Sequence, residues 1–331
     1  MGALLSILVP VYNVSPYLAD FLASFQGEVD AGVELVFWDD ASSDHSVEII
    51  QTWQAAQTRY DVKLFRNASN QGVTQTRQHL LSKAQGEYIW YVDPDDLLAN
   101  DAVDVVIRTL NRHRPDVFLF GYQVFDDATG RTKAQEQLLF KSADVKVNDP
   151  AHELYQVAIQ DNKHYFWNKV FKRAIVAHIE IQAMPVYEDI YYVPTWLFHC
   201  QNYVYLDQPL VKYRLREGSL SHRNDFTQVY AIYAYLDQAA FCLKQIGEGK
   251  TYAYLLYKAY MHYYRLQNAL NKRDGAITES DAVPLSTALL DIRQHHFPVS
   301  GWGLVGQLGK SGMFGKMLKL ALILTKQSHY G

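Results

Sequence analysis

Cysteine is scarce in this 331-residue chain, which contains only Cys200 and Cys242. Two thiols are too few for a disulfide framework, and they fit a protein of a reducing compartment. We expect both to be buried free thiols. The 12 histidines are scattered without the spacing of a zinc site. The sequence therefore indicates neither a small disulfide-stabilised protein nor a zinc-binding one.

Long apolar runs and a strong charge of one sign are also missing. No apolar run reaches the roughly 20 residues that span a bilayer, and the N-terminus lacks the basic segment and cleavage site of a signal peptide. The net charge of −4 provides no general attraction to nucleic acid. Hydrophobic residues make up 49% of the chain, which is enough for a core. We therefore expect a folded, cytoplasmic protein without a nucleic-acid partner.

The first hundred residues repeat a pattern of apolar strand, polar turn and helix. Strands are expected over 4–11, 33–38, 62–66 and 88–92, and helices over 16–25, 46–56 and 73–84. This alternation predicts a doubly wound, mainly parallel sheet with right-handed crossovers. The polar turns then all lie at the carboxyl edge of the sheet, where ligands bind in such folds.

The second half of the chain is rich in tyrosine and changes character near His222. Further strands are expected over 116–124, 204–206 and 210–215, with a hairpin or surface excursion over 126–147. Helices are expected to begin near 151 and 188 and to dominate from 225 onward. We therefore predict an α/β domain over 1–222 and a helical module over 223–331. The tyrosine-rich helices could pack internally or against a second copy, as in a homodimer.

A cluster of carboxylates ends the strand over 88–92. Pro94 cannot continue the hydrogen-bonded ladder, so Asp93, Asp95 and Asp96 are expected in a turn. Asp93 and Asp95 can face one hard cation, and carboxylate oxygens suit magnesium or manganese. The alternative is a solvated acidic turn in which Asp95 or Asp96 caps the next helix.

Three more features are expected at the same edge. Asp40 ends the second strand, where it can accept a hydrogen bond from a base or a sugar hydroxyl. Gly72 in the Asn70-x-Gly72 turn lets the backbone approach a ligand, and the N-terminus of the following helix favours phosphate. Arg77 on that helix can contact a nucleobase or a diphosphate. The alternatives are a plain turn at 70–72 and an Arg77 side chain in solvent.

These features belong to a set of motifs that resembles family 2 glycosyltransferases of the GT-A fold, of the bacterial surface-polysaccharide kind. The motifs are 7–13, 38–44, 70–72, 91–96, 167–169, 188–189 and 213–214, in the order and spacing of that family. Ala41 replaces the glycine of the family's Asp-Asp-Gly-Ser pattern, and Gln78 replaces the asparagine of its Ala-Arg-Asn pattern. The resemblance implies a GT-A (Rossmann-like) nucleotide-diphospho-sugar transferase sheet over 1–222. It does not extend to the C-terminal all-helical module.

The resemblance implies a metal-dependent, inverting transfer of a sugar from a nucleotide-diphosphate sugar, with UDP as the family's usual nucleotide. The acceptor would be a hydroxyl of a growing bacterial surface glycan, such as a lipid-linked precursor of capsule or lipopolysaccharide. The residues expected to bind the nucleotide sugar are Pro10, Tyr12, Asn13, Asp40, Asn70, Gly72, Arg77, Asp93, Pro94 and Asp95. Asp93 and Asp95 would hold Mn²⁺ or Mg²⁺, with His222 as a third ligand. Arg214 or Arg216 could contact the diphosphate.

Residues 188–189 match the position of the family's catalytic base. The resemblance therefore implies that Asp189, or alternatively Glu188, deprotonates the acceptor hydroxyl. The alternative is an acidic pair that the helix dipole favours at a helix N-terminus. Trp167, Asn168 and Lys169 would bind the acceptor, unless Trp167 belongs to the core.

The segment over 313–326, drawn as a helix, is basic and amphipathic. Lys316, Lys319 and Lys326 fall on one narrow arc. The broad apolar arc consists of Phe314, Met317, Leu318, Leu320, Ala321, Leu322 and Leu324. One interpretation is a helix that lies in the membrane interface, which predicts a peripheral protein on the inner face of the bacterial cytoplasmic membrane. The other is a final helix docked on the core.

Two rival functions stay open at this point. A nucleotidyltransferase on a similar sheet would have a glycine-rich, basic phosphate loop after the first strand, whereas residues 11–15 contain neither glycine nor charge. A nucleotide-sugar-binding or scaffold protein without turnover would not need the full set of carboxylates that this chain retains.

Overall fold

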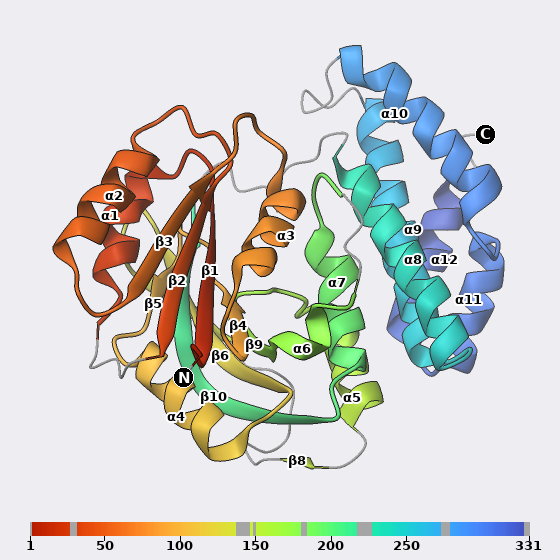
Figure 1. Ribbon diagram of the computed structural model, residues 1–331. Coiled ribbons are helices and arrows are strands. Elements are labelled where there is room, and N and C mark those ends of the chain that lie inside the picture. The colour runs from red at the N-terminus through yellow and green to blue at the C-terminus, as the bar shows by residue number, and fades with distance from the viewer. Residues whose placement is uncertain are drawn as a thin grey trace. The chain divides into compact units, whose positions relative to one another are not determined.

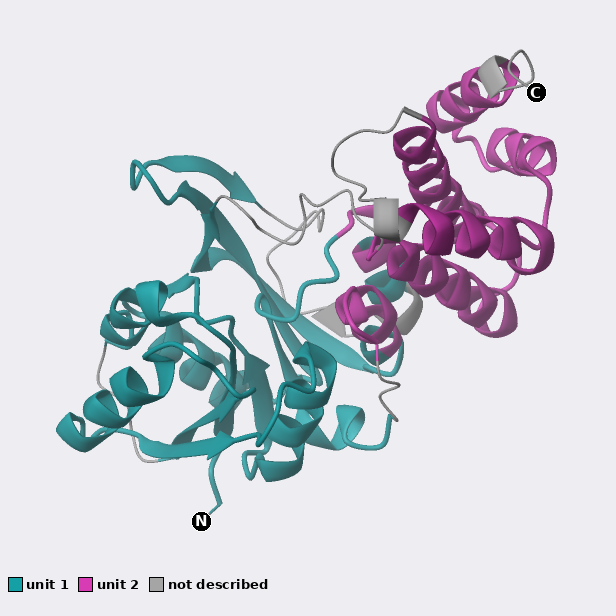
Figure 2. Cartoon of the chain, turned by 90° about the horizontal axis from the view of Figure 1, so that it is seen from above, with its two compact units in different colours: residues 1–157, 163–183, 196–217 teal, residues 158–162, 184–195, 218–331 magenta. Residues whose placement is uncertain are grey.

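The computed structural model describes residues 2–26, 32–136, 146–147, 150–179, 184–216, 227–272 and 279–327. The chain forms two compact units, coloured separately in Figure 2. Unit 1 comprises Met1–Val157, Lys163–Ala183 and Trp196–Glu217, and unit 2 comprises Ala158–Asn162, Met184–Thr195 and Gly218–Gly331. The domain boundary predicted at His222 lies outside the described residues. Unit 2 combines the C-terminal helices with two short segments from earlier in the chain.

Unit 1 is built on one mixed sheet with the strand order β3-β2-β1-β4-β9-β6-β10-β5. These strands are β1 (Leu5–Val11), β2 (Val33–Asp39), β3 (Asp61–Arg66), β4 (Tyr88–Tyr91), β5 (Leu97–Leu98), β6 (Val117–Asp126), β9 (Lys169–Lys172) and β10 (Asn202–Leu215). The first four strands of the chain are parallel, and β10 runs parallel to β6. The short strand β9 lies antiparallel between β4 and β6. The predicted alternation of strands and helices is therefore confirmed, with an antiparallel strand between the two parallel parts.

Two further strands extend the sheet at its margin. β7 (Thr132–Glu136) pairs with β6, and the two-residue β8 (Lys146–Val147) pairs with β10. β6 and β7 are antiparallel, so they form a hairpin at the start of the segment where a hairpin was predicted. Residues 137–145 of that segment lie outside the described part of the chain.

Alternating side chains of the strands face two helical layers. Leu5, Ile7 and Val9 of β1 belong to a core that also contains residues of α1 (Ser15–Ala23), α2 (Ser46–Ala56) and α4 (Ala102–His113). α3 (Val73–Lys83) covers the other face, as Figure 1 shows for the β1–β3 region. Because neighbouring side chains on a strand point to opposite faces, this pattern buries both sides of the sheet. The polar segments after β1, β2, β3 and β4 consequently meet at one edge.

Unit 2 is helical. Its main helices are α8 (Gln228–Gln245), α9 (Lys250–Lys272), α10 (Glu279–Asp291), α11 (Gly301–Lys310) and α12 (Phe314–Gln327), with a π-helical turn, Ile292–His296, after α10. α5 (Pro150–Gln160) ends in this unit and α7 (Glu188–Phe198) begins in it, whereas the short α6 (Arg173–Val176) belongs to unit 1. Many tyrosines of α9 are buried within the unit, including Tyr260, whose ring centre lies 3.8 Å from that of Phe297.

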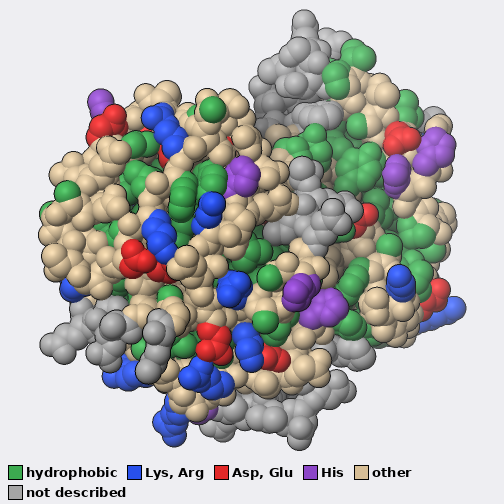
Figure 3. Space-filling view, viewed as in Figure 1, with side chains coloured by type: hydrophobic (Ala, Val, Ile, Leu, Met, Phe, Trp, Pro, Cys, Tyr) green, Lys and Arg blue, Asp and Glu red, His purple; other side chains and the backbone are tan. Residues whose placement is uncertain are grey.

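Cys200 and Cys242 are buried and free, as expected. In the part of the chain that the structure describes, no helix has the length and apolar character to cross a membrane. Figure 3 shows acidic and basic side chains interspersed on the visible face, with hydrophobic side chains reaching the surface among the C-terminal helices.

Candidate functional site

The carboxyl ends of β1 and β2 form one interlocked polar edge. Asn13 follows β1 with a φ of 50°, and its Oδ1 accepts a hydrogen bond from the Ser43 N–H at 2.9 Å. The Asn13 N–H in turn donates to Ser42 Oγ at 2.9 Å. Pro10 is half-buried at the end of β1, and the side chain of Tyr12 stands at the surface with 50% exposure. Two motifs that are 30 residues apart in sequence therefore hold each other in place.

The Asp40 carboxylate organises the loop between β3 and α3. Its Oδ1 accepts hydrogen bonds from Asn67 Nδ2 (2.7 Å) and from the Gln71 N–H (2.8 Å), and its Oδ2 accepts one from the Gly72 N–H (2.8 Å). Asp40 is only 3% exposed. Hydrogen bonds to an ionised acceptor are strong, so this carboxylate fixes the loop. If Asp40 contacts a base or a sugar hydroxyl as predicted, that ligand group must share the two carboxylate oxygens with the loop.

The turn at 70–72 leads the chain into α3. Gly72 has a φ of 87°, in the left-handed region that favours glycine. Its carbonyl oxygen accepts hydrogen bonds from the Thr76 N–H and Thr76 Oγ1, both at 3.0 Å. Asn70 lies exposed beside it. The turn thus presents an exposed amide side chain next to a helix N-terminus, which carries partial positive charge.

Arg77 on α3 is buried and forms an ion pair with Asp93. Its Nη2 lies 3.0 Å from Asp93 Oδ1, and its guanidinium carbon lies 4.7 Å from the centre of the Phe166 ring. Because Arg77 is 8% exposed, the interpretation of a side chain in solvent is wrong. Burial raises the pKa of Asp93, and the charge of Arg77 opposes that rise. This pair joins α3 to the acidic turn after β4.

The three carboxylates of the acidic turn have different environments. The side chains of Asp93 and Asp95 are 29% and 24% exposed, whereas Asp96 is 1% exposed. Pro94 is buried between them. Asp96 Oδ1 accepts a hydrogen bond from the backbone N–H of a residue in β10, and burial raises the pKa of this carboxyl well above its usual value. α4 begins after Asp101, so neither Asp95 nor Asp96 caps it.

Two arginines at the end of β10 contact this turn. Arg214 is 7% exposed, and its Nε donates to the Asp95 carbonyl oxygen at 2.7 Å while its Nη1 lies 2.6 Å from Asp127 Oδ1. Arg216 has a side chain that is 32% exposed, and its Nε and Nη2 both lie 2.9 Å from Asp95 Oδ2. Arg214 therefore stabilises the turn, and Arg216 neutralises one of its exposed carboxylates.

The acidic turn offers oxygen donors for a divalent cation. Asp93 Oδ2 and Asp95 Oδ1 accept no hydrogen bond from any described residue. Over the described ranges, no three side chains of His, Cys, Asp or Glu converge as a metal site. Mg²⁺ and Mn²⁺ often take only one or two carboxylates and complete their shell with water and substrate phosphates. Asp93 and Asp95 therefore fit such a cation chemically, and His222 lies outside the described residues.

Residues 167–169 lie in the interior of unit 1. The Trp167 ring is 4% exposed and stacks between Tyr165 and Tyr213, with ring centres 4.9 and 5.6 Å away. Asn168 is 0% exposed, and the Lys169 ammonium donates to Asn168 Oδ1 (2.6 Å) and to two backbone carbonyls. Both faces of the indole are covered by protein, which favours the core interpretation of Trp167.

Glu188 and Asp189 begin α7 within unit 2. Tyr187, with a φ of 63°, ends the preceding turn, and its hydroxyl accepts a hydrogen bond from Gln228 Nε2 of α8. Asp189 is half-buried and its Oδ1 accepts from the Ile190 N–H at 2.8 Å, whereas Glu188 is 6% exposed. The predicted start of a helix at this pair is confirmed. Its catalytic role stays a prediction.

Some residues at this edge gave no specific signal in the sequence. Asn67 bridges Asp40 and the indole Nε1–H of Trp38, which lies 2.8 Å from Asn67 Oδ1. Phe166 lies under the Arg77 guanidinium. Asn67 is one of several polar residues in a loop, and Phe166 is one of many aromatic residues. The signal that could have identified Asn67 and Phe166 is their position next to predicted motifs.

Comparisons with known proteins identify the family of the chain. The family model described as glycosyl transferase family 2 matches residues 6–177, more than half of the chain. The processive diacylglycerol beta-glycosyltransferase of Mycoplasma pneumoniae is 25% identical over 253 residues, which cover 75% of this chain and 74% of that protein. Glycosyltransferase GlyA of Streptococcus pneumoniae is 27% identical over 224 residues, which cover 66% of this chain but only 31% of that protein.

Solved structures share the fold. TarS 1–349 of S. aureus in complex with UDP-GlcNAc matches with a TM-score of 0.64 and 18% identity, covering 92% of this chain and 83% of that chain. TarS 1–349 alone matches with a TM-score of 0.60 and 17% identity, covering 88% and 91%. These matches confirm the predicted GT-A type of architecture. Together with the family match over residues 6–177, they establish that the chain belongs to glycosyl transferase family 2 and is a glycosyltransferase, as its motifs indicated.

Proposed function

We propose that this glycosyltransferase transfers a sugar from a UDP-sugar to a hydroxyl of a growing, lipid-linked bacterial surface glycan, with inversion at the anomeric carbon. The observation that carries the proposal is the meeting of three features at one sheet edge. These are the loop held by Asp40, the Arg77–Asp93 pair and the Asp95–Arg216 pair. Arginines and a helix N-terminus recognise anionic diphosphates. The fold of TarS, which was solved with UDP-GlcNAc, supports the choice of UDP.

The nucleoside side of the proposed site is formed by the loops after β1 and β3. Pro10, Tyr12 and Asn13 would contact the nucleoside, because the exposed Tyr12 ring offers a face on which a base can stack. Asn70 would donate a hydrogen bond from the neighbouring turn. Asp40 would act mainly as a positioning residue, since its oxygens already bind the loop over 67–72.

The diphosphate side is formed by α3 and the acidic turn. Gly72 brings the backbone and the α3 N-terminus close to the phosphates, and Pro94 fixes the turn that carries Asp93 and Asp95. These two carboxylates are the proposed ligands of Mn²⁺ or Mg²⁺, with His222 as a third. A cation bound there would supply Lewis-acid stabilisation of the departing diphosphate.

Two arginines would add positive charge on this diphosphate side. Arg77 stands beside Asp93, and Arg216 pairs with Asp95 through a partly exposed side chain. Arg216 can therefore turn from Asp95 toward the diphosphate.

The proposed general base is Asp189, with Glu188 as the alternative. Its carboxylate would take the proton of the acceptor hydroxyl as that oxygen bonds to the anomeric carbon. The bond between the anomeric carbon and the diphosphate oxygen breaks, and its electron pair leaves with the nucleotide diphosphate. The half-buried position of Asp189 supports this role, because part of its carboxylate stays open to an acceptor hydroxyl.

The acceptor and the location of the enzyme are also proposals. The name of the Mycoplasma relative, a processive diacylglycerol beta-glycosyltransferase, supports a lipid-linked acceptor at a membrane. α12 would then attach the enzyme to the inner face of the cytoplasmic membrane as a peripheral protein. Trp167, Asn168 and Lys169 would support the acceptor-binding surface from within the core of unit 1.

Calorimetric titration of UDP into the purified chain tests the donor site, with manganese and then with a chelator. We expect metal-dependent binding by the wild type and by Glu48→Gln, which changes an exposed carboxylate on α2, and no binding by Asp95→Ala. Metal-independent binding of equal strength would contradict the metal role. Binding of GDP or dTDP in place of UDP would move the proposal to another nucleotide.

Turnover separates the proposed enzyme from its two rivals. We expect UDP release from a UDP-sugar to fall at least 100-fold in Asp189→Asn while UDP binding persists, as for a general base. Full turnover by Asp189→Asn would move the base to Glu188 or elsewhere. UDP binding with no turnover on any UDP-sugar would favour a nucleotide-sugar-binding protein. Release of pyrophosphate from UTP and a sugar phosphate would favour a nucleotidyltransferase.

A further inference from the structure

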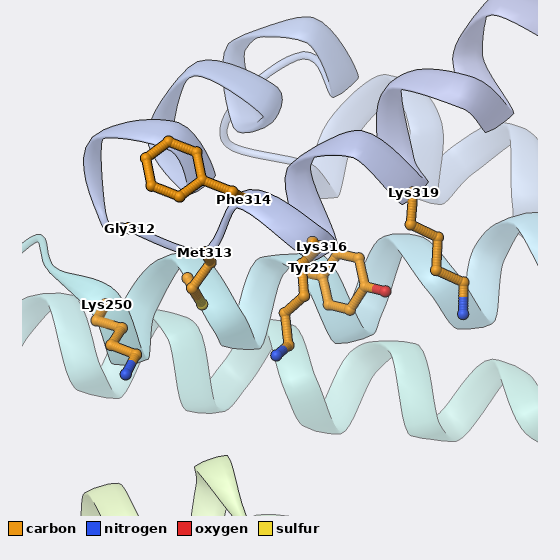
Figure 4. Close-up of a pocket in the computed structure, with 8 residues that line it drawn as sticks. Lys250, Tyr257, Gly312, Met313, Phe314, Lys316 and Lys319 are labelled. Carbon is orange, nitrogen blue, oxygen red and sulfur yellow. The ribbon is translucent and has the colours of Figure 1, made fainter.

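Unit 2 contains a basic pocket that the proposed reaction does not use. The pocket has a volume of about 590 Å³ and lies between α9 and the start of α12 (Figure 4). Its side chains come from Lys250, Tyr257, Met313, Phe314, Lys316 and Lys319. Three of these six side chains carry positive charge, and none carries negative charge. The pocket therefore combines apolar side chains with the positive charge of an anion site.

The lysines of this pocket lack acidic partners. Neither Lys250, Lys316 nor Lys319 forms an ion pair with any residue that the structure describes. Lys316 Nζ lies 5.0 Å from the centre of the Tyr254 ring instead. A folded protein normally places counter-charges near clustered lysines, because like charges repel. A bound anion would supply the missing charge.

The neighbouring part of α9 is basic as well, although the charges of Asp161 and Glu248 reach Tyr254 and Tyr252 on this helix. Lys258 is half-buried, with its Nζ 5.3 Å from the centre of the Tyr235 ring. Burial, followed by the charges of Arg265 and Lys316, lowers the pKa of Lys258 to about 8. The positive charge of the pocket thus continues along α9 to Lys258 and Arg265.

α12 also carries an apolar stripe, on a different helix face from Lys316 and Lys319. Phe314, Leu318 and Leu322 are 61%, 58% and 64% exposed, and their spacing of four residues puts them on one helix face. Leu320, on the opposite side, is 0% exposed and anchors the helix within unit 2. In Figure 4 the Phe314 ring points away from the side chains of Lys316 and Lys319. The helix is therefore docked by one face and leaves a second, hydrophobic face uncovered.

We propose that this pocket binds the phosphate group of an anionic phospholipid while Phe314, Leu318 and Leu322 enter the bilayer interface. The charge is complementary to a phosphate, and the exposed stripe on another face of α12 is the kind of surface by which amphipathic helices bind membranes. The inference deepens the proposed membrane association of α12 by naming the lipid class and the residues that select it. It is independent of the nucleotide site.

Flotation of the full chain with vesicles tests the proposal. We expect stronger binding to phosphatidylcholine vesicles that contain phosphatidylglycerol than to phosphatidylcholine alone. The double variant Lys316→Gln/Lys319→Gln should lose roughly 30-fold in affinity for the anionic vesicles, since each lysine near an anionic surface contributes a factor of about five. The matched control Lys244→Gln/Lys310→Gln removes two exposed lysines of unit 2 outside the pocket and should keep wild-type binding.

Two further measurements separate the contribution of apolar contact from that of charge, and lipid phosphate from free phosphate. Phe314→Ser/Leu318→Ser should weaken binding to both kinds of vesicle, because it removes apolar area rather than charge. Inorganic phosphate is the soluble probe, and it should not compete with the vesicles at equal phosphate concentration. Competition by inorganic phosphate without a vesicle preference would identify a free-phosphate site and overturn the lipid assignment.

The remaining outcomes are also decisive. Equal binding to both vesicle types, or equal losses in the pocket variant and its control, would overturn the proposal. Calorimetric titration of UDP into the same variants should give wild-type affinity, and circular dichroism should show wild-type helix content. Loss of vesicle selectivity with intact UDP binding therefore bears on the lipid pocket alone. Failure of UDP binding in the wild type bears on the proposed function alone.

Discussion

Asp40 and Gly72 are joined by a hydrogen bond of 2.8 Å from the Gly72 N–H to Asp40 Oδ2. This bond links the end of β2 to the start of α3, across 32 residues of sequence. The other carboxylate oxygen of Asp40 holds Asn67 and Gln71 of the same loop. One buried carboxylate thereby fixes both the loop after β3 and the orientation of the α3 N-terminus. In the proposed donor site, Asp40 would therefore act on the ligand through the backbone that it positions.

Replacement of Asp40 by alanine should destabilise unit 1. It leaves three donors without their charged acceptor, so we expect the free energy of unfolding to fall by about 2–4 kcal/mol. UDP affinity should fall as well, because the loop loses its anchor. Urea denaturation and calorimetry measure the two effects. Asp61→Asn, at an exposed carboxylate of β3, is the control and should change neither. Wild-type stability of Asp40→Ala would show that the loop is held by other contacts.

Ala41 lies in the left-handed region with a φ of 60°. The family pattern has glycine at this position, and the structure gives the physical reason, since a Cβ atom costs roughly 1–2 kcal/mol in this conformation. We expect Ala41→Gly to raise the free energy of unfolding by about 0.5–1 kcal/mol, after the entropy lost by glycine is deducted. Thermal and urea unfolding measure the gain. Ala19→Gly, at an exposed position in the interior of α1, should lose about 1 kcal/mol, so this control changes stability in the opposite direction. A loss of stability in both variants would contradict the strain at Ala41.

Arg216 covers one oxygen of Asp95, with two nitrogens at 2.9 Å. A cation that binds Asp95 must share the carboxylate with this arginine. We therefore expect Arg216→Gln to bind Mn²⁺ roughly tenfold more tightly in the absence of nucleotide, the equivalent of about 1.4 kcal/mol. Calorimetric titration of manganese measures this, and UDP affinity should fall in the same variant.

The matched control for this arginine is Arg112→Gln. Arg112 is an exposed residue in the last turn of α4, and its replacement should leave both affinities unchanged. Weaker binding of manganese by Arg216→Gln would show that the arginine supports the metal site rather than competing with the metal.

Local patterns predicted most of the fold. The strands through Val11, Asp39 and Tyr91 follow from β-branched and aromatic runs that end at polar residues, and α3 follows from Gly72 and a helical spacing. The antiparallel insertion of β9 could not be predicted, because Lys169–Lys172 is short and its partners lie far away in the chain. Strand order depends on such distant pairings, and a single sequence gives no direct signal for them.

In the candidate site, too, local features could be predicted, whereas contacts between residues far apart in the sequence could not. Carboxylates that directly follow an apolar strand form a local pattern, which can be recognised in a single sequence. The turn at Asp93–Asp96 is formed as this pattern predicted. The bond from the Arg214 N–H to Asp96 Oδ1 joins residues 118 positions apart. Whether a tryptophan lies in the core or on the surface likewise depends on distant partners, as Trp167 illustrates with Tyr213.

Trp167 provides a test of its two interpretations. Its ring is enclosed by aromatic side chains, so Trp167→Ala should lower the free energy of unfolding by about 3–5 kcal/mol. Trp167→Phe retains most of the apolar volume and should keep the wild-type KM for the acceptor. Denaturation and steady-state kinetics measure these outcomes. A raised acceptor KM in a stably folded Trp167→Phe would instead support a direct contact with the acceptor.

Lys258 should make the stability of unit 2 depend on pH. Its pKa falls from 10.5 to about 8 in the folded state, because of burial and the charges of Arg265 and Lys316. Between these two values the unfolded chain binds more protons than the folded chain, so stability rises with pH over this window. Below about pH 8 the full cost of the buried charge is present.

Replacement of Lys258 by methionine should therefore stabilise the protein at about pH 7. We expect a gain of about 3 kcal/mol, because the fall of the Lys258 pKa from 10.5 to about 8 costs about 1.36 kcal/mol for each pKa unit. The gain should shrink as the pH approaches 10.5, where the wild-type lysine is neutral in the folded state and half protonated in the unfolded state. Urea denaturation at the two pH values measures it, and Lys244→Met, at an exposed lysine of α8, should show no such difference. An equal gain at both pH values would mean that methionine stabilises through packing, and that the Lys258 charge is already compensated.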